Sequence, residues 1–152
     1  MSKVRKYLKM EADVEFFACV HGASLIFLYG CIQWLNGIEE VPFSVIFQQM
    51  VLGYAIAWIQ KGLFWKETTY TRVEYGIREV MWNVIPIVLI VVTGQVFEWL
   101  PGVSRWIEVA FYIVIGCYFI MVWLFLKYIY KKETEEINQL LKNRRERGEE
   151  DE

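Results

Sequence analysis

Long runs of apolar positions alternate with short polar segments along the whole chain. The runs cover residues 16–35, 41–60, 80–97 and 109–126, and none of the four contains a charged side chain. A helix needs about 20 apolar residues to cross the hydrocarbon core of a bilayer, which is roughly 30 Å thick. The pattern therefore predicts an all-α fold, an integral membrane four-helix bundle in which the four runs are the spans.

Lysine and arginine are unequally distributed between the two sides of these spans. Four precede the first span, four lie between the second and third, and seven follow the fourth, whereas Arg105 stands alone between the third and fourth. Loops on the cytoplasmic side of a membrane carry an excess of Lys and Arg. We therefore expect a multi-pass protein of the cell membrane with both termini and the middle loop in the cytoplasm.

The pattern divides the chain into a four-span domain, residues 1–126, and a cytoplasmic helical tail, residues 127–152. The tail is predicted to continue the fourth helix to about Arg147. Gly148 and the acidic run 149–152 are expected to end it, because glycine is unfavourable inside a helix.

Three apolar residues of this tail, Ile137, Leu140 and Leu141, recur at helical spacing. So short a stripe would not sustain a coiled coil alone. We expect it either to bind a partner protein or to lie back on the helix that leads into the third span.

A polar segment with a helix-start signal precedes the third span. Thr71 followed by Glu74 matches a capping box, so the third helix is expected to begin near Thr71, before the membrane. Its projecting first turns are predicted to bind a partner. The alternative is a solvated helix end that only carries positive-inside charges. The candidate binding residues are Arg72, Glu74, Tyr75, Arg78 and Glu79.

Pro86 lies inside the third span. Proline has no N–H to donate to the carbonyl four residues earlier, which belongs to Trp82, so a kink is expected. Asn83 lies one turn before Pro86 and is a candidate to satisfy a freed group. Pro86 and Asn83 together are interpreted either as a hinge or as a static kink.

Uncharged polar and small residues inside the spans predict how the helices pack. Close helix packing in lipid uses small side chains and a few hydrogen bonds. Pairs of small residues four apart predict close backbone approach: Ala18 and Gly22 in the first span, Gly53 and Ala57 in the second. Helix-to-helix hydrogen bonds are expected from Gln33, Gln48, Gln49, Gln60 and Gln95.

The sequence contains no pattern typical of catalysis or of metal binding. Cys19, Cys31 and Cys117 are interpreted as small apolar residues, and His21, the one histidine, as a packed or hydrogen-bonded side chain rather than a pH sensor or haem ligand. No span contains Asp or Glu, which disfavours ion-coupled transport. We therefore expect a non-enzymatic protein without a cofactor or a metal.

Three segments resemble a known group of proteins: residues 71–86 (TRVEYGIREVMWNVIP), 117–123 (CYFIMVW) and 133–142 (ETEEINQLLK). The chain is similar to small four-span bacterial membrane proteins that are paired with LytTR-type transcription regulators in Gram-positive bacteria. The resemblance implies an inhibitor that holds its cognate DNA-binding regulator at the membrane. Release of that regulator would switch on genes such as those for competence or bacteriocins.

The expected partners are thus a cytoplasmic transcription regulator and membrane lipid, with a homodimer possible and no direct contact with nucleic acid. The alternative function is a small transporter or bacteriocin-immunity protein that acts within the bilayer as a homo-oligomer. That alternative predicts a phenotype without any soluble partner, and sensitivity to changes at Gln48, Gln49 or Asn83.

Overall fold

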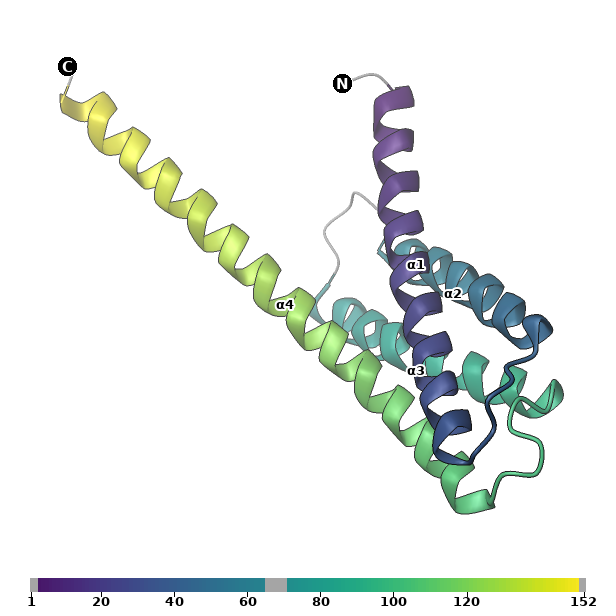
Figure 1. Cartoon of the computed structure of the whole chain (residues 1–152). Helices are drawn as coiled ribbons and strands as arrows, with labels where there is room; N and C mark the ends of the chain where they lie inside the picture. The colour runs from purple at the N-terminus through teal and green to yellow at the C-terminus, as the bar shows by residue number, and fades with distance from the viewer. Residues whose placement is uncertain (1–2, 65–70, 151–152) are drawn as a thin grey trace. The chain divides into compact units, whose positions relative to one another are not determined.

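The computed structural model describes the backbone of residues 3–64 and 71–150, and the side chains of residues 7–8, 10–64 and 71–143. Over this part of the chain the fold is all-α and contains no strand, which confirms the predicted fold class of a four-helix bundle. The helices follow one another in the order shown in Figure 1. They are α1 (Lys3–Leu35), α2 (Phe43–Leu63), α3 (Arg72–Val96) and α4 (Arg105–Glu150).

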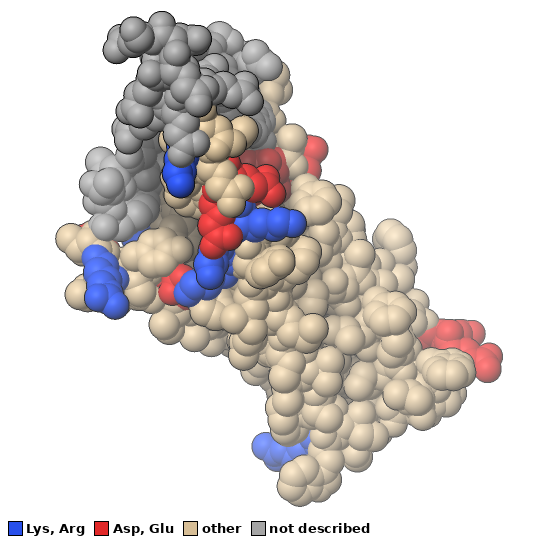
Figure 2. Space-filling view, turned by 90° about the vertical axis from the view of Figure 1, so that its left-hand side faces the viewer, with Lys and Arg blue, Asp and Glu red and all other residues tan. Residues whose placement is uncertain are grey.

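Each helix contains a stretch that is long and apolar enough to cross a membrane. These stretches are Met10–Leu35, Phe43–Leu63, Arg72–Val96 and Arg105–Asn143. Figure 2 shows a broad surface that carries no charged side chains. Most of the charged side chains in this view are gathered toward one end of the face. The chain is a multi-pass membrane protein.

Two helices extend beyond the predicted bounds. α1 begins at Lys3, so its first turns precede the run of apolar residues. α4 continues through the predicted tail, as expected, but it includes Gly148 and ends at Glu150. Glycine lowers helix stability by about 1 kcal/mol relative to alanine, which weakens a helix without obliging it to stop.

The chain forms two compact units, Met1–Cys117 and Tyr118–Glu152, and the division falls inside α4. In the first unit α1 and α2 are antiparallel neighbours, joined by a short turn in which Gly37 has a φ of +74°. We call the end of this unit where α1 begins, α2 ends and α3 begins the basic end. Lys61 and Arg78 lie there. The other end is the turn end.

The contact between α1 and α2 is closest at two glycines. A Cβ atom built on Gly53 would lie 2.7 Å from the main-chain nitrogen of Gly22 and 3.0 Å from the carbonyl oxygen of Ala18. On the opposite side, a Cβ built on Gly22 would lie 2.8 Å from the sulfur of Met50, which is a flexible side chain. The predicted close approach of small residues is confirmed. Nearby, Val14, Ala18 and Ala57 form a buried apolar cluster.

Candidate functional site

Hydrogen bonds between buried polar groups link three of the membrane-spanning helices. His21 on α1 lies 2.8 Å from Gln60 on α2, measured from His21 Nε2 to Gln60 Oε1. Gln60 Nε2 donates to the main-chain carbonyl of Trp82 on α3, at 3.2 Å. The side chains of His21, Gln60 and Trp82 are all buried. We call these three residues the three-helix network.

Pro86 explains why the Trp82 carbonyl is available to Gln60. In an uninterrupted helix this oxygen would accept the N–H of residue 86, which proline lacks. A buried carbonyl without a donor is costly, and the amide of Gln60 supplies the missing donor from the neighbouring helix. The sequence did not reveal this role for Gln60, because the two residues are 22 positions apart and meet only through helix packing.

Asn83, the candidate to satisfy the freed group, bonds elsewhere. Its Nδ2 donates to the carbonyl of Glu79, one turn earlier on the same helix, at 3.1 Å. This bond follows from geometry, since a short side chain inside a helix reaches the carbonyl four residues before it. Asn83 therefore does not provide the donor for the Trp82 carbonyl. Pro86 does leave this carbonyl without a donor from its own helix, as expected.

The hydrogen-bond pattern fixes the protonation of one ring atom of His21. A carbonyl oxygen only accepts, so the nitrogen of the Gln60 amide must face Trp82 and its oxygen must face His21. His21 Nε2 must then carry the hydrogen and donate to Gln60. The imidazole ring also stacks on Phe17, with ring centroids 6.1 Å apart. His21 thus has the packed, hydrogen-bonded role that was expected.

The other glutamines differ in how they are used. Gln48 accepts from the indole Nε1 of Trp99 at 2.8 Å, and Gln95 donates to Glu108 and, at 3.4 Å, to Tyr112. These bonds join different helices or the turn after α3, as predicted. The prediction was wrong for Gln33, which donates to Tyr29 within α1 because that hydroxyl lies one turn away.

Gln49 is the exception among them. It is fully buried on α2, and neither polar atom of its amide has a hydrogen-bond partner in the part of the chain that the structure describes. The expected helix-to-helix bond from Gln49 is therefore not formed. Its neighbours on the buried face of α2 include Val45 and Gly53, which offer no side-chain acceptor.

The start of α3 is built as the sequence predicts. Thr71 is the N-cap, its hydroxyl accepts from the N–H of Glu74 at 3.3 Å, and the Glu74 carboxylate accepts from the N–H of Thr71 at 3.1 Å. Both halves of the capping box are present. The box satisfies two of the donors that a helix start leaves unpaired.

Two candidate binding residues hold the start of α3 on the end of α2. The guanidinium of Arg78 donates to the carbonyl of Leu63, in the last turn of α2. The ring of Tyr75 contacts that of Phe64, with centroids 5.7 Å apart. Arg78 and Tyr75 thus position this segment, which the sequence could not show because both partners lie across the loop.

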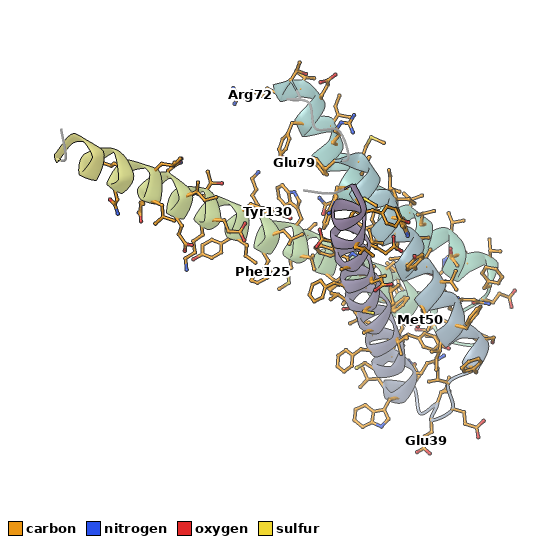
Figure 3. The ribbon with its side chains drawn as sticks, turned by 90° about the horizontal axis from the view of Figure 1, so that it is seen from above. Glu39, Met50, Arg72, Glu79, Phe125 and Tyr130 are labelled. Atoms are coloured by element: carbon orange, nitrogen blue, oxygen red, sulfur yellow. The ribbon has the colours of Figure 1, made fainter. Side chains whose placement is uncertain are left out.

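The remaining surface of this segment is exposed and partly apolar. Val73 is 71% exposed and Ile77 is 55% exposed, and Arg72 beside them is exposed as well. Glu79 is half-buried. Figure 3 shows Arg72 and Glu79 on the first turns of α3, far from Glu39 at the turn end. Val73 and Ile77 were not among the candidates, although their spacing of four places them on one helical face.

Two carboxylates that precede the first apolar run contact α2. α1 begins at Lys3, so Glu11 and Asp13 lie on helical turns ahead of the apolar run. Asp13 forms an ion pair with Lys61 at 2.8 Å, and Glu11 accepts from the hydroxyl of Tyr54 at 3.4 Å. Both contacts join α1 to α2 at the basic end. These carboxylates precede the charge-free run of residues 16–35, on turns of α1 that were not predicted from the sequence to be helical.

The apolar stripe of the tail is present in the second unit. Ile137 is 58%, Leu140 is 67% and Leu141 is 56% exposed. Nearer the start of this unit, the ammonium of Lys127 lies 4.7 Å from the centroid of the Trp123 ring. Lysine over an indole is a favourable cation–π contact. Past Lys127 the exposed large apolar side chains of the described residues are Tyr128, Tyr130, Ile137, Leu140 and Leu141.

The described residues bring no three His, Cys, Asp or Glu side chains together in an arrangement that could hold a metal ion. The chain matches no protein-family model, no curated protein and no solved structure.

Proposed function

We propose that this protein is a membrane inhibitor that binds a cytoplasmic LytTR-type transcription regulator and keeps it from DNA until a signal releases it. The observation that carries the proposal is the exposed stripe of Ile137, Leu140 and Leu141 on a helix that continues far past the last apolar span. The unequal distribution of Lys and Arg supports an orientation with both termini and the basic end in the cytoplasm.

The length of α4 supports a role outside the bilayer. A helix of 46 residues is about 69 Å long at 1.5 Å per residue, more than twice the roughly 30 Å of the hydrocarbon core. Its tail is too rich in charge to lie in lipid. An amphipathic helix with an exposed apolar face is a common element in protein recognition. The occupant we propose is an apolar groove on the regulator.

The start of α3 supports a second contact with the same partner. Val73 and Ile77 form an exposed apolar surface beside Arg72, at the basic end. Arg78 and Tyr75 hold this surface in place through the end of α2. Occupation of two sites on one regulator would cover its dimerisation or DNA-binding face. The sequence resemblance of residues 71–86 and 133–142 is the support for a LytTR-type partner.

The test is co-purification of the regulator with the tagged protein from gently solubilised membranes. Replacing Ile137, Leu140 and Leu141 by Ser is expected to abolish recovery of a stoichiometric DNA-binding protein. The matched control replaces Glu135, Gln139 and Lys142 by Ser, because these residues lie on the opposite side of the same helix turns. Recovery from the control should equal that from the parent. If the variant of Ile137, Leu140 and Leu141 also recovers as much regulator as the parent, the tail is rejected as a main contact.

A second function, transport or immunity within the bilayer by a homo-oligomer, is favoured by the fully buried amide of Gln49. A polar group without a partner inside a membrane protein is a common mark of a functional site. Under this function, a preparation from native membranes contains only copies of the chain itself. Changes at Gln48, Gln49 or Asn83 then alter the phenotype, whereas changes in the tail do not.

A further inference from the structure

We propose that the hydrogen bond from Gln60 to the carbonyl of Trp82 is a releasable latch that fixes the first half of α3 on α2. When it opens, that half turns about Pro86. The inference deepens the proposed function, and rests on it only where the moving segment is taken to bind the regulator. The latch itself is a property of the isolated protein, and its parts are the three-helix network and Pro86.

The contacts of α3 fall into two groups that are separated by Pro86. The half before Pro86 contacts the end of α2. The carbonyl of Trp82 accepts from Gln60, and Arg78 donates to the carbonyl of Leu63. The ring of Tyr75 contacts that of Phe64, the residue after α2. The first half of α3 is thus attached to one short stretch of α2.

After Pro86, the partners of α3 change. Gln95 bonds to Glu108, and a Cβ on Gly94 would lie 2.5 Å from the hydroxyl of Tyr112, so this half packs on the start of α4. Trp99, just after α3, bonds to Gln48 near the other end of α2. A helix anchored differently on the two sides of a proline can bend there, so that its first half leaves α2 while the contacts of its second half stay intact.

Gln60 bonds to α3 one turn before Pro86, where the helix is weakest. Proline has removed the main-chain bond that would stiffen the helix at Trp82, and the side chain of Gln60 replaces it from outside the helix. A side-chain amide can leave by rotating its own torsions, whereas a main-chain donor cannot. Both partners are uncharged, so opening leaves no buried charge without a counterion.

His21 is a positioning residue for this latch. Its Nε2 donates to the oxygen of Gln60, and so turns the amide nitrogen toward Trp82. Because α1 and α2 are held together at Gly22 and Gly53, the ring of His21 stays in place while α3 moves. α1 and α2 therefore form the fixed part of the device, and the first half of α3 forms its moving part.

The test measures the position of α3 directly in the full-length protein in lipid nanodiscs. Spin labels are placed at Ala12 on α1 and Val73 on α3, in a background without native cysteines, and the distance distribution is measured by double electron–electron resonance. The parent is expected to give one narrow distribution. Gln60→Met, which keeps the side-chain length but removes the donor, should add a second distance. Gln33→Met is the matched control, because Gln33 bonds only within α1, and it should match the parent.

A second substitution separates the latch from a general loss of packing. Pro86→Ala provides a main-chain N–H for the carbonyl of Trp82, so Gln60 becomes redundant. In this background Gln60→Met is expected to leave the distribution narrow. If Gln60→Met alone prevents folding, the double variant should fold again. The proposal is overturned if Gln60→Met leaves the parent distribution unchanged, if it broadens the distribution equally in both backgrounds, or if Pro86→Ala fails to rescue folding.

The link to the regulator is read out separately. Gln60→Met should reduce recovery of the regulator several-fold although every exposed residue of the binding surface is intact, and Pro86→Ala/Gln60→Met should restore it. If the parent recovers no regulator, the proposed function fails and the distance measurements alone judge the latch. If the distances respond but recovery does not, the link between the latch and binding is rejected.

Discussion

At the residue scale, Gly53 determines how closely α1 and α2 approach each other. The atoms that a Cβ at this position would meet are main-chain atoms of Gly22 and Ala18, which cannot move aside without displacing α1. In lipid, where the hydrophobic effect does not drive helices together, such close contact provides much of the attraction. One missing side chain therefore supports the rigid pair on which the three-helix network depends.

Gly53→Ala is accordingly expected to destabilise the protein by about 1–3 kcal/mol, the usual cost of forcing extra volume into a well-packed site. The measurement is the thermal unfolding midpoint in mild detergent, together with retention of helical circular dichroism. Gly62→Ala in the same helix is the control, because a Cβ there meets nothing within 4 Å. It should leave stability unchanged or raise it slightly. Equal midpoints for the two variants would show that the glycine contact is not tight.

Polar contacts at this scale were only partly predictable. The sequence indicated that glutamines would bond inside the bundle, but not with which partners. Gln60 reaches Trp82 because α2 and α3 pack at that height, and Gln33 finds Tyr29 on its own helix before any neighbour. Asn83 was expected near the gap made by Pro86 and bonds to Glu79 instead. The hydrogen-bond partner of a buried side chain depends on how the helices pack, and a local sequence pattern does not show how they pack.

At the element scale, α3 is the helix whose start was predicted best. The two residues that cap this helix start lie only three positions apart in the sequence, so Thr71 and Glu74 are sufficient to place the N-cap. What the sequence did not show is that Tyr75 and Arg78 fasten this start to α2. Those contacts fix the position of the start of α3 relative to α2. Val73 and Ile77 remain exposed there and form the apolar part of its surface.

Thr71→Ala is expected to cost about 1 kcal/mol of helix stability, the typical loss for removing an N-cap side chain. The loss should be local. Hydrogen–deuterium exchange is expected to accelerate at the amides of the first turn of α3, Glu74 above all, and to stay slow beyond Trp82. Thr71→Ser keeps the hydroxyl acceptor and should retain the parent pattern. Fast exchange throughout α3 would contradict this account, since it would mean that the cap stabilises the whole helix.

At the scale of the whole molecule, long apolar runs without charge sufficed to predict an all-α membrane fold. The reason is physical, since each span must satisfy its own main-chain hydrogen bonds in lipid and so must be helical. The bounds were less predictable, because helix formation continues into charged sequence at the start of α1 and the end of α4. As a result Glu11 and Asp13 lie on the first turns of α1, where they contact α2.

Orientation is tested by labelling single cysteines in intact cells with a membrane-impermeant maleimide. Cysteines at Glu39 and Arg105 are expected to react from outside, because both positions lie at the turn end and are exposed. Cysteines at Tyr7 and Ile137 should react only after the cells are permeabilised. The background must lack the native thiols, which are Cys19, Cys31 and Cys117. The reverse pattern would place the basic end outside and would remove the basis for a cytoplasmic partner.

The asymmetry of the glycine contact also constrains how sequences of this kind can diverge. A side chain at position 53 meets main chain, and no substitution elsewhere can make room for it. A side chain at position 22 meets the sulfur of Met50, which can move or be replaced by something smaller. Homologous chains that share this helix crossing should thus keep glycine at 53. Position 22 is free to vary, and a larger residue there should be accompanied by a smaller residue at position 50. Covariation between positions 22 and 50 would therefore identify chains that share this helix crossing.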